Sequence, residues 1–319
     1  MKIVKAGWEF IDRPPRAGRM KAIETAGRLC YKSESKISAA SAPKFVRNLI
    51  LHHHDAMLEH GDYVFRIKDQ GVYKAVAEGM QMLRDATGMA PNLIMTNIDG
   101  RPIISGNIRA WREILLANAG IAYYFAGHID GNYKFDLPEY ESVDPDQRVE
   151  EMSYIELEGR ERMAHYRMGV KFTCDRGISH EFVRHRQFAF AQESTRYCNY
   201  ASGKFGAEIT VVSPSQFGEK CYWAGTSWED WESVCTSAEH AYKRMMERYC
   251  TAQEARVVLP TSTKTELIMT GNLYAWKHFF DLRALEKTGP AHPQAKEIAL
   301  PALEGFRDIF PDIFAEERA

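Results

Sequence analysis

An apolar repeat at helical spacing in the second half of the chain restricts its fold most strongly. The repeat predicts a long amphipathic helix and consists of Trp231, Val234, Cys235, Ala238, Tyr242, Met245 and Tyr249. Short segments with strand character precede it at residues 170–174 and 209–212. No regular strand–helix–strand rhythm joins these segments, so the sequence favours an α+β fold over a doubly wound parallel sheet.

The remaining elements are predicted from local patterns in the same way. Strands are expected at residues 2–11 and 63–67, and an extended segment at 187–197. Helices are expected at residues 19–31, 42–54, around 108–115, from 175 to about 186, at 255–259 and from 272 to about 287. Ser41 is the expected N-cap of the second helix, a capping box at 251–254 precedes the fifth, and Asn272 caps the last. Turn-rich runs at residues 97–106 and 127–147 predict long loops.

Composition excludes several broad classes of protein. The 319 residues are 45% hydrophobic and 26% charged, as in soluble globular proteins, and the net charge of −2 gives no support for a general nucleic-acid or membrane-surface binder. No apolar run has the length of a signal peptide core or a membrane span. The six cysteines lack metal-ligand spacing, so no structural zinc site is expected, and we expect reduced thiols in a cytoplasmic protein.

Residues 184–197 carry the densest group of functional side chains, with three arginines and a histidine among apolar residues. In an extended segment, Gln192, Ser194 and Arg196 would project to one face, because side chains alternate along a strand. A hydroxyl and a guanidinium on one face suit a phosphate group. The alternative interpretation is a solvated basic edge strand, and the spacing alone does not decide between them.

Arg283 occupies an unusual place in the pattern of the last predicted long helix. From the Asn272 cap, Trp276, Phe279 and Arg283 follow on one face, so the arginine lies on the apolar side. A buried cation needs an anionic partner. That partner is either a carboxylate of this chain or a ligand that becomes negatively charged.

Two other candidate positions remain open between a structural and a functional interpretation. Arg256 lies inside an apolar run, where an arginine either extends to the surface or contacts a ligand. His54-Asp55 follows two further histidines and is either a helix end or part of a metal site. The chain contains no G-x-G-x-x-G, Walker A or G-x-S-x-G motif, so Rossmann, P-loop and serine-hydrolase chemistry gain no support.

One motif resembles a known family. Arg184-His185-Arg186, then seven residues, then Ser194 is similar to the R-H-R-x7-S signature of flavin-dependent thymidylate synthases. The resemblance covers residues 169–308 well and 19–67 loosely. It implies a mixed sheet packed with long helices in one domain spanning residues 1–319, with residues 68–168 as an insertion of unknown role.

The resemblance also implies roles for individual residues. The dUMP site would consist of Arg184, Gln192, Glu193, Ser194, Thr195, Arg196, Arg256 and Arg283. The FAD site would consist of His54, Arg184, His185, Arg186, Gln192, Asn272 and His278. Arg283 corresponds to the arginine that activates the uracil ring, and it is the expected catalytic residue. The chain departs from the family's pattern at Glu181, where glutamine is common, at Tyr274, where many members carry arginine, and at Met57-Leu58, which replaces Pro-Phe.

The chemistry that this resemblance implies is the methylation of dUMP to dTMP. NADPH would reduce FAD, and 5,10-methylenetetrahydrofolate would supply the one-carbon unit, in a homotetramer whose active sites lie between subunits. Two other hypotheses are a metal-dependent nucleotide phosphohydrolase using His54-Asp55, and a non-catalytic nucleotide- or RNA-binding protein that stacks bases on Phe188 and Phe190.

Overall fold

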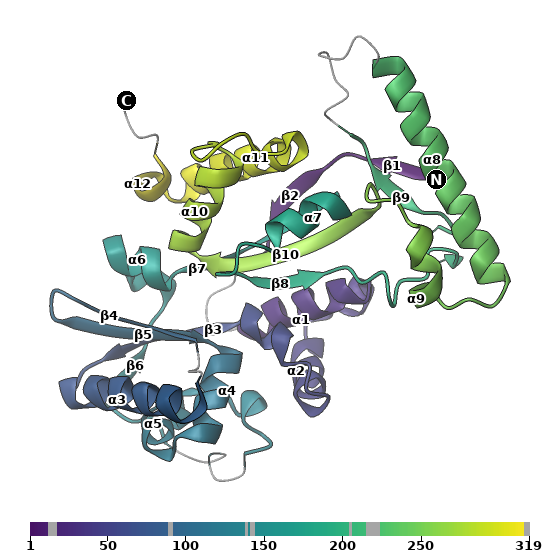
Figure 1. Cartoon of the computed structure of the whole chain (residues 1–319). Coiled ribbons are helices and arrows are strands. Elements are labelled where there is room, and N and C mark those ends of the chain that lie inside the picture. Colours follow the sequence, from purple (N-terminus) through teal and green to yellow (C-terminus); the bar gives the residue numbers. More distant parts are fainter. Residues whose placement is uncertain are drawn as a thin grey trace.

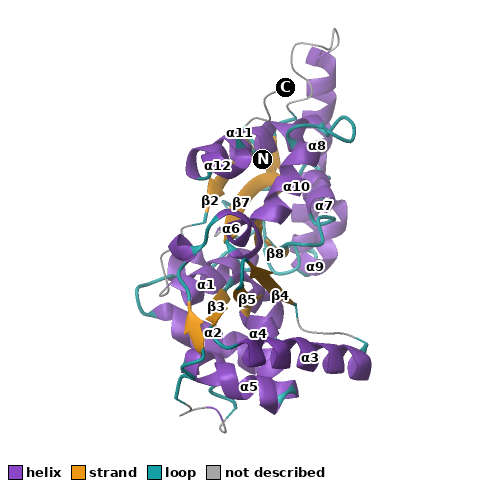
Figure 2. Cartoon of the chain, turned by 90° about the vertical axis from the view of Figure 1, so that its left-hand side faces the viewer, coloured by secondary structure: helices purple, strands orange, loops and turns teal. Residues whose placement is uncertain are grey.

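The computed structural model describes residues 1–11, 18–88, 92–137, 140, 144–203, 206–214 and 224–315. Within them, helices combine with two four-stranded sheets and one two-stranded sheet, as expected for an α+β fold (Figure 1). The helices α8 and α5 lie at opposite ends of the molecule in both views (Figure 1, Figure 2). The five cysteines in the described part are free thiols, and Cys221 lies outside it.

The first four-stranded sheet carries the signature segment. Its strand order is β2-β7-β10-β8, every neighbouring pair is antiparallel, and the strands are β2 (Gly7–Phe10), β7 (Arg167–Asp175), β10 (Lys264–Asn272) and β8 (Ala189–Gln192). The two central strands pair along nine residues, from Lys264 opposite Asp175 to Asn272 opposite Arg167. The predicted strand at 170–174 is therefore confirmed and is longer than its apolar core.

Helices cover both faces of this sheet. On one face, Leu267 and Met269 share a core with four helices, α7 (Arg176–Phe182), α10 (Leu273–Arg283), α11 (Pro293–Ile309) and α12 (Pro311–Phe314). On the other face, Ile268 packs against Ala26 and Leu29 of α1 (Arg19–Cys30). The alternation of side chains along β10 thus divides the interior into two cores.

A smaller unit completes the C-terminal half. The strands β1 (Lys2–Val4) and β9 (Thr210–Val212) pair in parallel, beside α8 (Ala224–Glu247), α9 (Ala252–Ala255) and the 3-10 helix η10 (Arg256–Val258). Their core includes Cys198, Tyr200, Cys235 and Tyr242. The single strand predicted at 2–11 is wrong, because β1 pairs with β9 whereas β2 pairs with β7.

The second four-stranded sheet is built largely from residues 68–168. Its order is β4-β5-β3-β6, with β4 (Leu93–Ile98), β5 (Arg101–Asn107), β3 (Asp62–Ile67) and β6 (Val149–Glu151). Helices α2 (Ser41–Leu51), α3 (Gln70–Thr87), α4 (Ile108–Ala117) and α5 (Ala119–Phe125) pack around its core, and α6 (Gly159–His165) leads to β7. Because β3 precedes residue 68, the segment shares its sheet with the preceding strand.

The prediction of a long loop at residues 97–106 is wrong. The chain there forms a hairpin, in which Ile98 pairs with Arg101 and Asp99-Gly100 makes the turn. Both turn residues have positive φ angles, 52° and 76°. This combination is the two-residue turn whose twist matches the twist of the flanking strands, and Asp-Gly is one of its preferred sequences. The Asp99-Gly100 dipeptide between two runs of strand-forming residues was the sequence signal for this hairpin.

Most predicted helices are confirmed, with local differences at their ends. α2 begins at Ser41, so this serine is the first helical residue and Ala40 is the N-cap. α7 ends at Phe182 instead of about 186. The capping box of Thr251 and Glu254 is present, but the α-helix it starts has only four residues before η10 follows. The short 3-10 helices η2 (Glu34–Lys36), η3 (Asp55–His60), η4 (Ala126–His128), η5 (Gly131–Tyr133) and η7 (Tyr154–Glu156) connect the longer elements.

A buried histidine joins α6 to the hairpin and leads to a pH prediction. His165 is fully buried, and its two ring nitrogens lie 2.8 Å from Thr96 Oγ1 and 2.7 Å from Ser105 Oγ. Burial lowers the pKa of His165 to about 4, so the folded protein holds the ring neutral. An unfolded histidine titrates near 6.5, and stability is therefore fully present above that pH and lost as the pH falls toward 4.

We expect the free energy of unfolding to fall between pH 7 and pH 5, with His165 contributing about 2 kcal/mol. Urea unfolding at a series of pH values measures this slope. The substitution His165→Gln removes the titrating group and should make the slope shallower. An identical slope in both proteins would contradict the assignment.

Candidate functional site

The helix α10 is built as the sequence pattern predicts. Asn272 is its N-cap, and its Oδ1 accepts a hydrogen bond from the backbone N–H of Ala275 at 2.9 Å. Trp276 and Phe279 on the apolar stripe are both fully buried. The stripe fixes the rotation of the helix against the sheet, and this rotation turns Arg283 at the end of α10 toward the C-terminal end of α7.

Arg283 has a carboxylate partner within the chain. Its Nη1 lies 2.5 Å from Glu181 Oε2, its Nη2 donates to the backbone oxygen of Glu181 at 3.4 Å, and its Nε donates to His185 Nε2 at 3.2 Å. The side chain of Arg283 is 20% exposed and that of Glu181 is 36% exposed. The alternative of an internal ion pair is thus confirmed, and about one-fifth of the Arg283 side chain remains exposed.

His185, the middle residue of the signature, is held neutral next to this pair. Burial, the positive charge of Arg283 and the neighbouring His278 together lower the pKa of His185 to about 4. Since a guanidinium only donates hydrogen bonds, His185 Nε2 acts as the acceptor and the ring proton is on Nδ1. The rings of His185 and His278 lie 6.1 Å apart, which places two predicted flavin-site residues side by side.

The signature continues into a turn, so the prediction of an extended segment to residue 197 is wrong. β8 ends at Gln192, and the backbone N–H groups of Tyr197 and Cys198 both donate to the carbonyl of Ser194. The Ser194 hydroxyl oxygen accepts from the backbone N–H of Arg196 at 3.3 Å. Gln192, Ser194 and Arg196 therefore do not alternate along a strand, and Arg196 reaches the surface from the turn, where its guanidinium lies over the Tyr197 ring.

The helix α7 links this segment to Arg283. Gln192 at the end of β8 donates from Nε2 to Ser179 Oγ at 2.8 Å and to Thr265 Oγ1 at 3.2 Å. Ser179 lies two residues before Glu181 on α7. One short helix thus holds both the start of the turn and the arginine, although the two segments are about 90 residues apart in the sequence.

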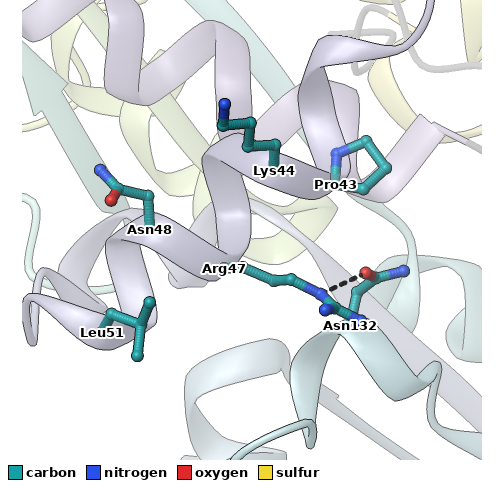
Figure 3. Close-up of a pocket in the computed structure, with 6 residues that line it drawn as sticks. All are labelled: Pro43, Lys44, Arg47, Asn48, Leu51 and Asn132. Carbon is teal, nitrogen blue, oxygen red and sulfur yellow. Dashed lines mark hydrogen bonds between the residues drawn. The ribbon is translucent and has the colours of Figure 1, made fainter.

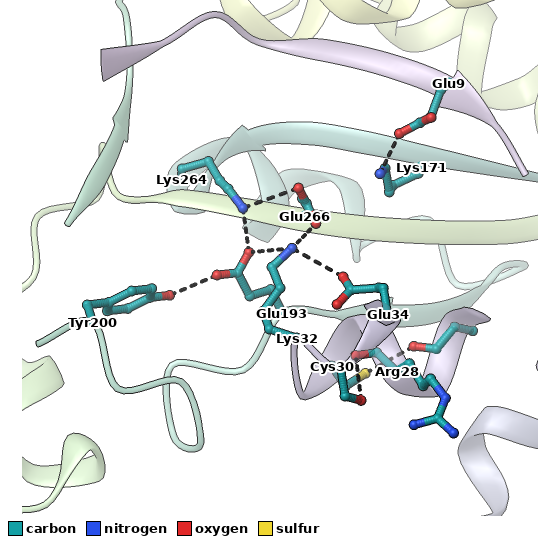
Figure 4. A network of polar contacts seen from close by, with 12 residues as sticks. Glu9, Arg28, Cys30, Lys32, Glu34, Lys171, Glu193, Tyr200, Lys264 and Glu266 are labelled. Carbon is teal, nitrogen blue, oxygen red and sulfur yellow. Dashed lines mark hydrogen bonds and ion pairs between the residues drawn. The ribbon is translucent and has the colours of Figure 1, made fainter. Parts of the chain in front are cut away.

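The Glu193 carboxylate is part of a buried network of ion pairs and hydrogen bonds (Figure 4). It is 2% exposed, its Oε1 accepts from the Tyr200 hydroxyl at 3.1 Å, and its Oε2 lies 2.7 Å from Lys264 Nζ and 3.5 Å from Lys32 Nζ. Lys32 and Lys264 both also contact Glu266. The network ties β8 to β10 and to the end of α1 directly before the turn.

The charges in this network stabilise one another. Burial by itself would raise the pKa of Glu266, but Lys264 and Lys32 outweigh it and lower the pKa to about 2. Burial likewise works against the charge of Lys32, whose pKa is nevertheless raised by Glu193 and Glu266. Sequence reasoning missed Lys32, Lys264 and Glu266. The signal for two of them was the polar alternation Lys264-x-Glu266 at the start of an apolar strand.

The other predicted site residues lie on several elements. Two residues of the signature, Arg184 and Arg186, are exposed. Arg256 and His278, which lie outside the signature, are exposed as well. Thr195 is buried, with 6% exposure, and Asn272 donates from Nδ2 to the carbonyl of Ala164 in addition to capping α10. Arg256 begins η10 directly after Ala255, which shares a core with Cys198 and Tyr200 at the end of the turn. His54 is the exposed N-cap of η3.

Comparison with known proteins identifies a matching family. Residues 154–312 match the model of the family described as thymidylate synthase complementing protein. The chain belongs to this family. The matched region holds both sides of the Arg283 contact, the turn and the ionic partners on β10, whereas Lys32 and His54 lie before it.

Curated relatives carry the name flavin-dependent thymidylate synthase. The protein of Pyrococcus furiosus is 33% identical over 131 residues, covering 41% of this chain and 50% of the relative. The protein of Mycobacterium avium is 28% identical over 161 residues, covering 47% and 60%. This chain therefore spans about half the length of the curated relatives it matches.

A solved structure also resembles this family member along its whole length. It is the UMP/dUMP methylase PolB of Streptomyces cacaoi bound with 5-Br UMP, with 14% identity, a TM-score of 0.44, and coverage of 98% of this chain and 94% of that one.

Other features of the family member lie away from these residues. An open pocket on α2 is lined by Pro43, Lys44, Arg47, Asn48, Leu51 and Asn132, and Arg47 Nε donates to Asn132 Oδ1 at 2.8 Å across it (Figure 3). Among the described residues, no three His, Cys, Asp or Glu side chains gather where they could hold a metal ion. No helix in that part of the chain is long and apolar enough to cross a membrane.

Proposed function

We propose that this chain is a flavin-dependent thymidylate synthase that converts dUMP to dTMP. In the proposed reaction, dUMP, 5,10-methylenetetrahydrofolate, NADPH and a proton give dTMP, tetrahydrofolate and NADP⁺. The methylene carbon becomes bonded to C5 of the uracil ring, the C5 proton leaves, and two electrons from NADPH reduce the methylene to a methyl group. When bound, FAD supplies the hydride for that reduction.

The contact of Arg283 with His185 carries this proposal, because it joins two parts of the predicted site that lie 98 residues apart in the sequence. Arg283 would polarise the uracil ring. The guanidinium of a side chain that is four-fifths buried stabilises developing negative charge better than a solvated one, since less water screens it.

The dUMP phosphate would bind at the turn. Ser194 and Arg196 offer a hydroxyl and an exposed guanidinium there, and Arg184 and Arg256 are exposed on neighbouring elements. Gln192 and Thr195 would support this site. The contribution of Glu193 would be to hold the turn through its buried contacts with Lys264 and Tyr200.

The chemistry of the donor groups fits FAD. Arg184 and Arg186 are exposed on either side of the buried His185, so two cations are free to face a pyrophosphate. His185, His278 and His54 would surround the flavin, and Asn272 would place the start of α10 beside it. The protein would be a homotetramer with active sites completed by neighbouring subunits, a state that light scattering of the purified protein measures.

A colour and turnover experiment tests the function. The purified protein should bind FAD and be yellow, and it should oxidise NADPH faster when dUMP is added. With methylenetetrahydrofolate present, dTMP should form, as measured by chromatography of the nucleotides. A protein that cannot be loaded with FAD, or that releases phosphate from dUMP instead, would contradict the proposal.

A further inference from the structure

The guanidinium of Arg283 is held by groups that leave part of it available. A guanidinium has five N–H donors. Three of them bind Glu181 Oε2, the carbonyl of Glu181 and His185 Nε2. Two donors remain for a polar group that approaches from outside α7.

Of the three groups that accept hydrogen bonds from Arg283, one is negatively charged. His185 is neutral, since its pKa is lowered to about 4, and the carbonyl of residue 181 carries only a dipole. The Glu181 carboxylate therefore offsets the positive charge of Arg283 at a separation of 2.5 Å. A glutamine at this position could accept the same hydrogen bond but would offset no charge.

We infer that Glu181 is a specificity-determining residue that offsets the charge of Arg283, so that the site binds the uracil ring in its neutral form and disfavours the ring ionised at N3. The inference rests on the proposed function. A ring that accepts the two remaining N–H donors of Arg283 lies within a few ångströms of the Glu181 carboxylate. A negative ring charge there is attracted by Arg283 and repelled by Glu181, so the carboxylate weakens this attraction without removing it.

The size of the effect follows from Coulomb's law with partial screening. Glu181 is about one-third exposed, so water weakens its field, and we expect its removal to change the affinity for an ionised ring by on the order of tenfold. The affinity for a neutral ring should change by less than about threefold, because a glutamine keeps the hydrogen bond to Arg283.

The experiment compares a neutral and an ionised ring in the same site. The probe is 5-fluoro-dUMP, whose fluorine withdraws electrons and makes the N3 proton more acidic, so that the ring ionises in mild alkali. Calorimetry gives its Kd for the flavin-loaded protein at about pH 6.5 and about pH 9, for the parent chain and for Glu181→Gln. We expect Glu181→Gln to bind the ionised ring about tenfold more tightly than the parent chain does, and to bind dUMP at the lower pH with nearly unchanged affinity.

Two further variants separate the charge of Glu181 from a structural role. Glu181→Asp keeps the charge and should keep the parent's ratio of affinities at the two pH values. Asp281→Asn neutralises a carboxylate on α10 that pairs with Lys287 at 3.0 Å, and it should leave that ratio unchanged. Thermal unfolding of each variant shows whether it is folded.

The possible failures can be told apart. If the parent chain binds dUMP but Glu181→Gln gives the parent's ratio, the inference is wrong and the proposed function stands. If Asp281→Asn gives the same change as Glu181→Gln, the charge effect is not specific to Glu181 and the inference is also wrong. If no pyrimidine nucleotide binds the flavin-loaded parent, both the function and the inference are wrong.

Discussion

Replacing Arg283 with alanine should abolish dTMP formation while leaving FAD bound. The substitution removes the guanidinium that we propose polarises the uracil ring, and loss of one such donor lowers kcat by at least about 100-fold. Stability should change little, by about 1 kcal/mol or less, since Glu181 is one-third exposed and water can solvate its carboxylate when the ion pair is lost. Single-turnover formation of dTMP and the flavin absorbance of the same sample measure both quantities.

The matched control for this substitution is Lys287→Ala. Lys287 is a cation four residues further along the chain that pairs with Asp281. It should retain nearly full turnover. Turnover in Arg283→Ala equal to that of the control would remove Arg283 from the mechanism, whereas loss of both turnover and flavin would show that Arg283 holds the cofactor as well.

The substitution Trp276→Ala should have the largest effect on stability, about 3–5 kcal/mol. Trp276 is fully buried, donates from its indole N–H to the carbonyl of Met168 at 3.0 Å, and packs edge-on against Phe188 with ring centroids 4.7 Å apart. Its removal leaves a cavity between α10 and the sheet and takes the indole donor away from the Met168 carbonyl. Urea unfolding measures the loss.

Because Phe188 lies within the signature, Trp276→Ala should also loosen the site and weaken FAD binding. Tyr274→Ala on the same helix is the control, since Tyr274 is 48% exposed, and it should cost less than about 1 kcal/mol. Equal destabilisation by the two substitutions would mean that the core beneath the signature does not depend on Trp276.

Local sequence patterns predicted the elements that hold the site but not the partners of its side chains. The Asn272 cap and the apolar stripe of α10 depend on neighbours within one or two turns of helix, so they could be recognised directly. Glu181 is 102 residues away from Arg283. Only the antiparallel pairing of β7 with β10 brings α7 to the end of α10, and no local pattern specifies that pairing.

The turn after β8 shows why the extended prediction failed. An alternating pattern is compatible with a strand as long as a neighbouring strand is present to pair with it. Past Gln192, the Glu193 carboxylate is held by Lys264 and Lys32, and the backbone N–H of Ser194 donates to the carbonyl of Cys30 on α1 instead of to a strand. These contacts come from distant segments, and they direct the chain into the turn.

The amino-acid sequence by itself determined the mixture of helices and strands, the family signature and the position of Arg283 on an apolar helix face. Each of these features depends on residues that are close to one another along the chain. Tertiary structure alone decided that the charge of Arg283 is offset by Glu181, that Glu193 forms buried ion pairs with two lysines, and that the second half of the signature is a turn. These features depend on which segments pack together, and the free energy of such packing comes from contacts between residues far apart in the sequence.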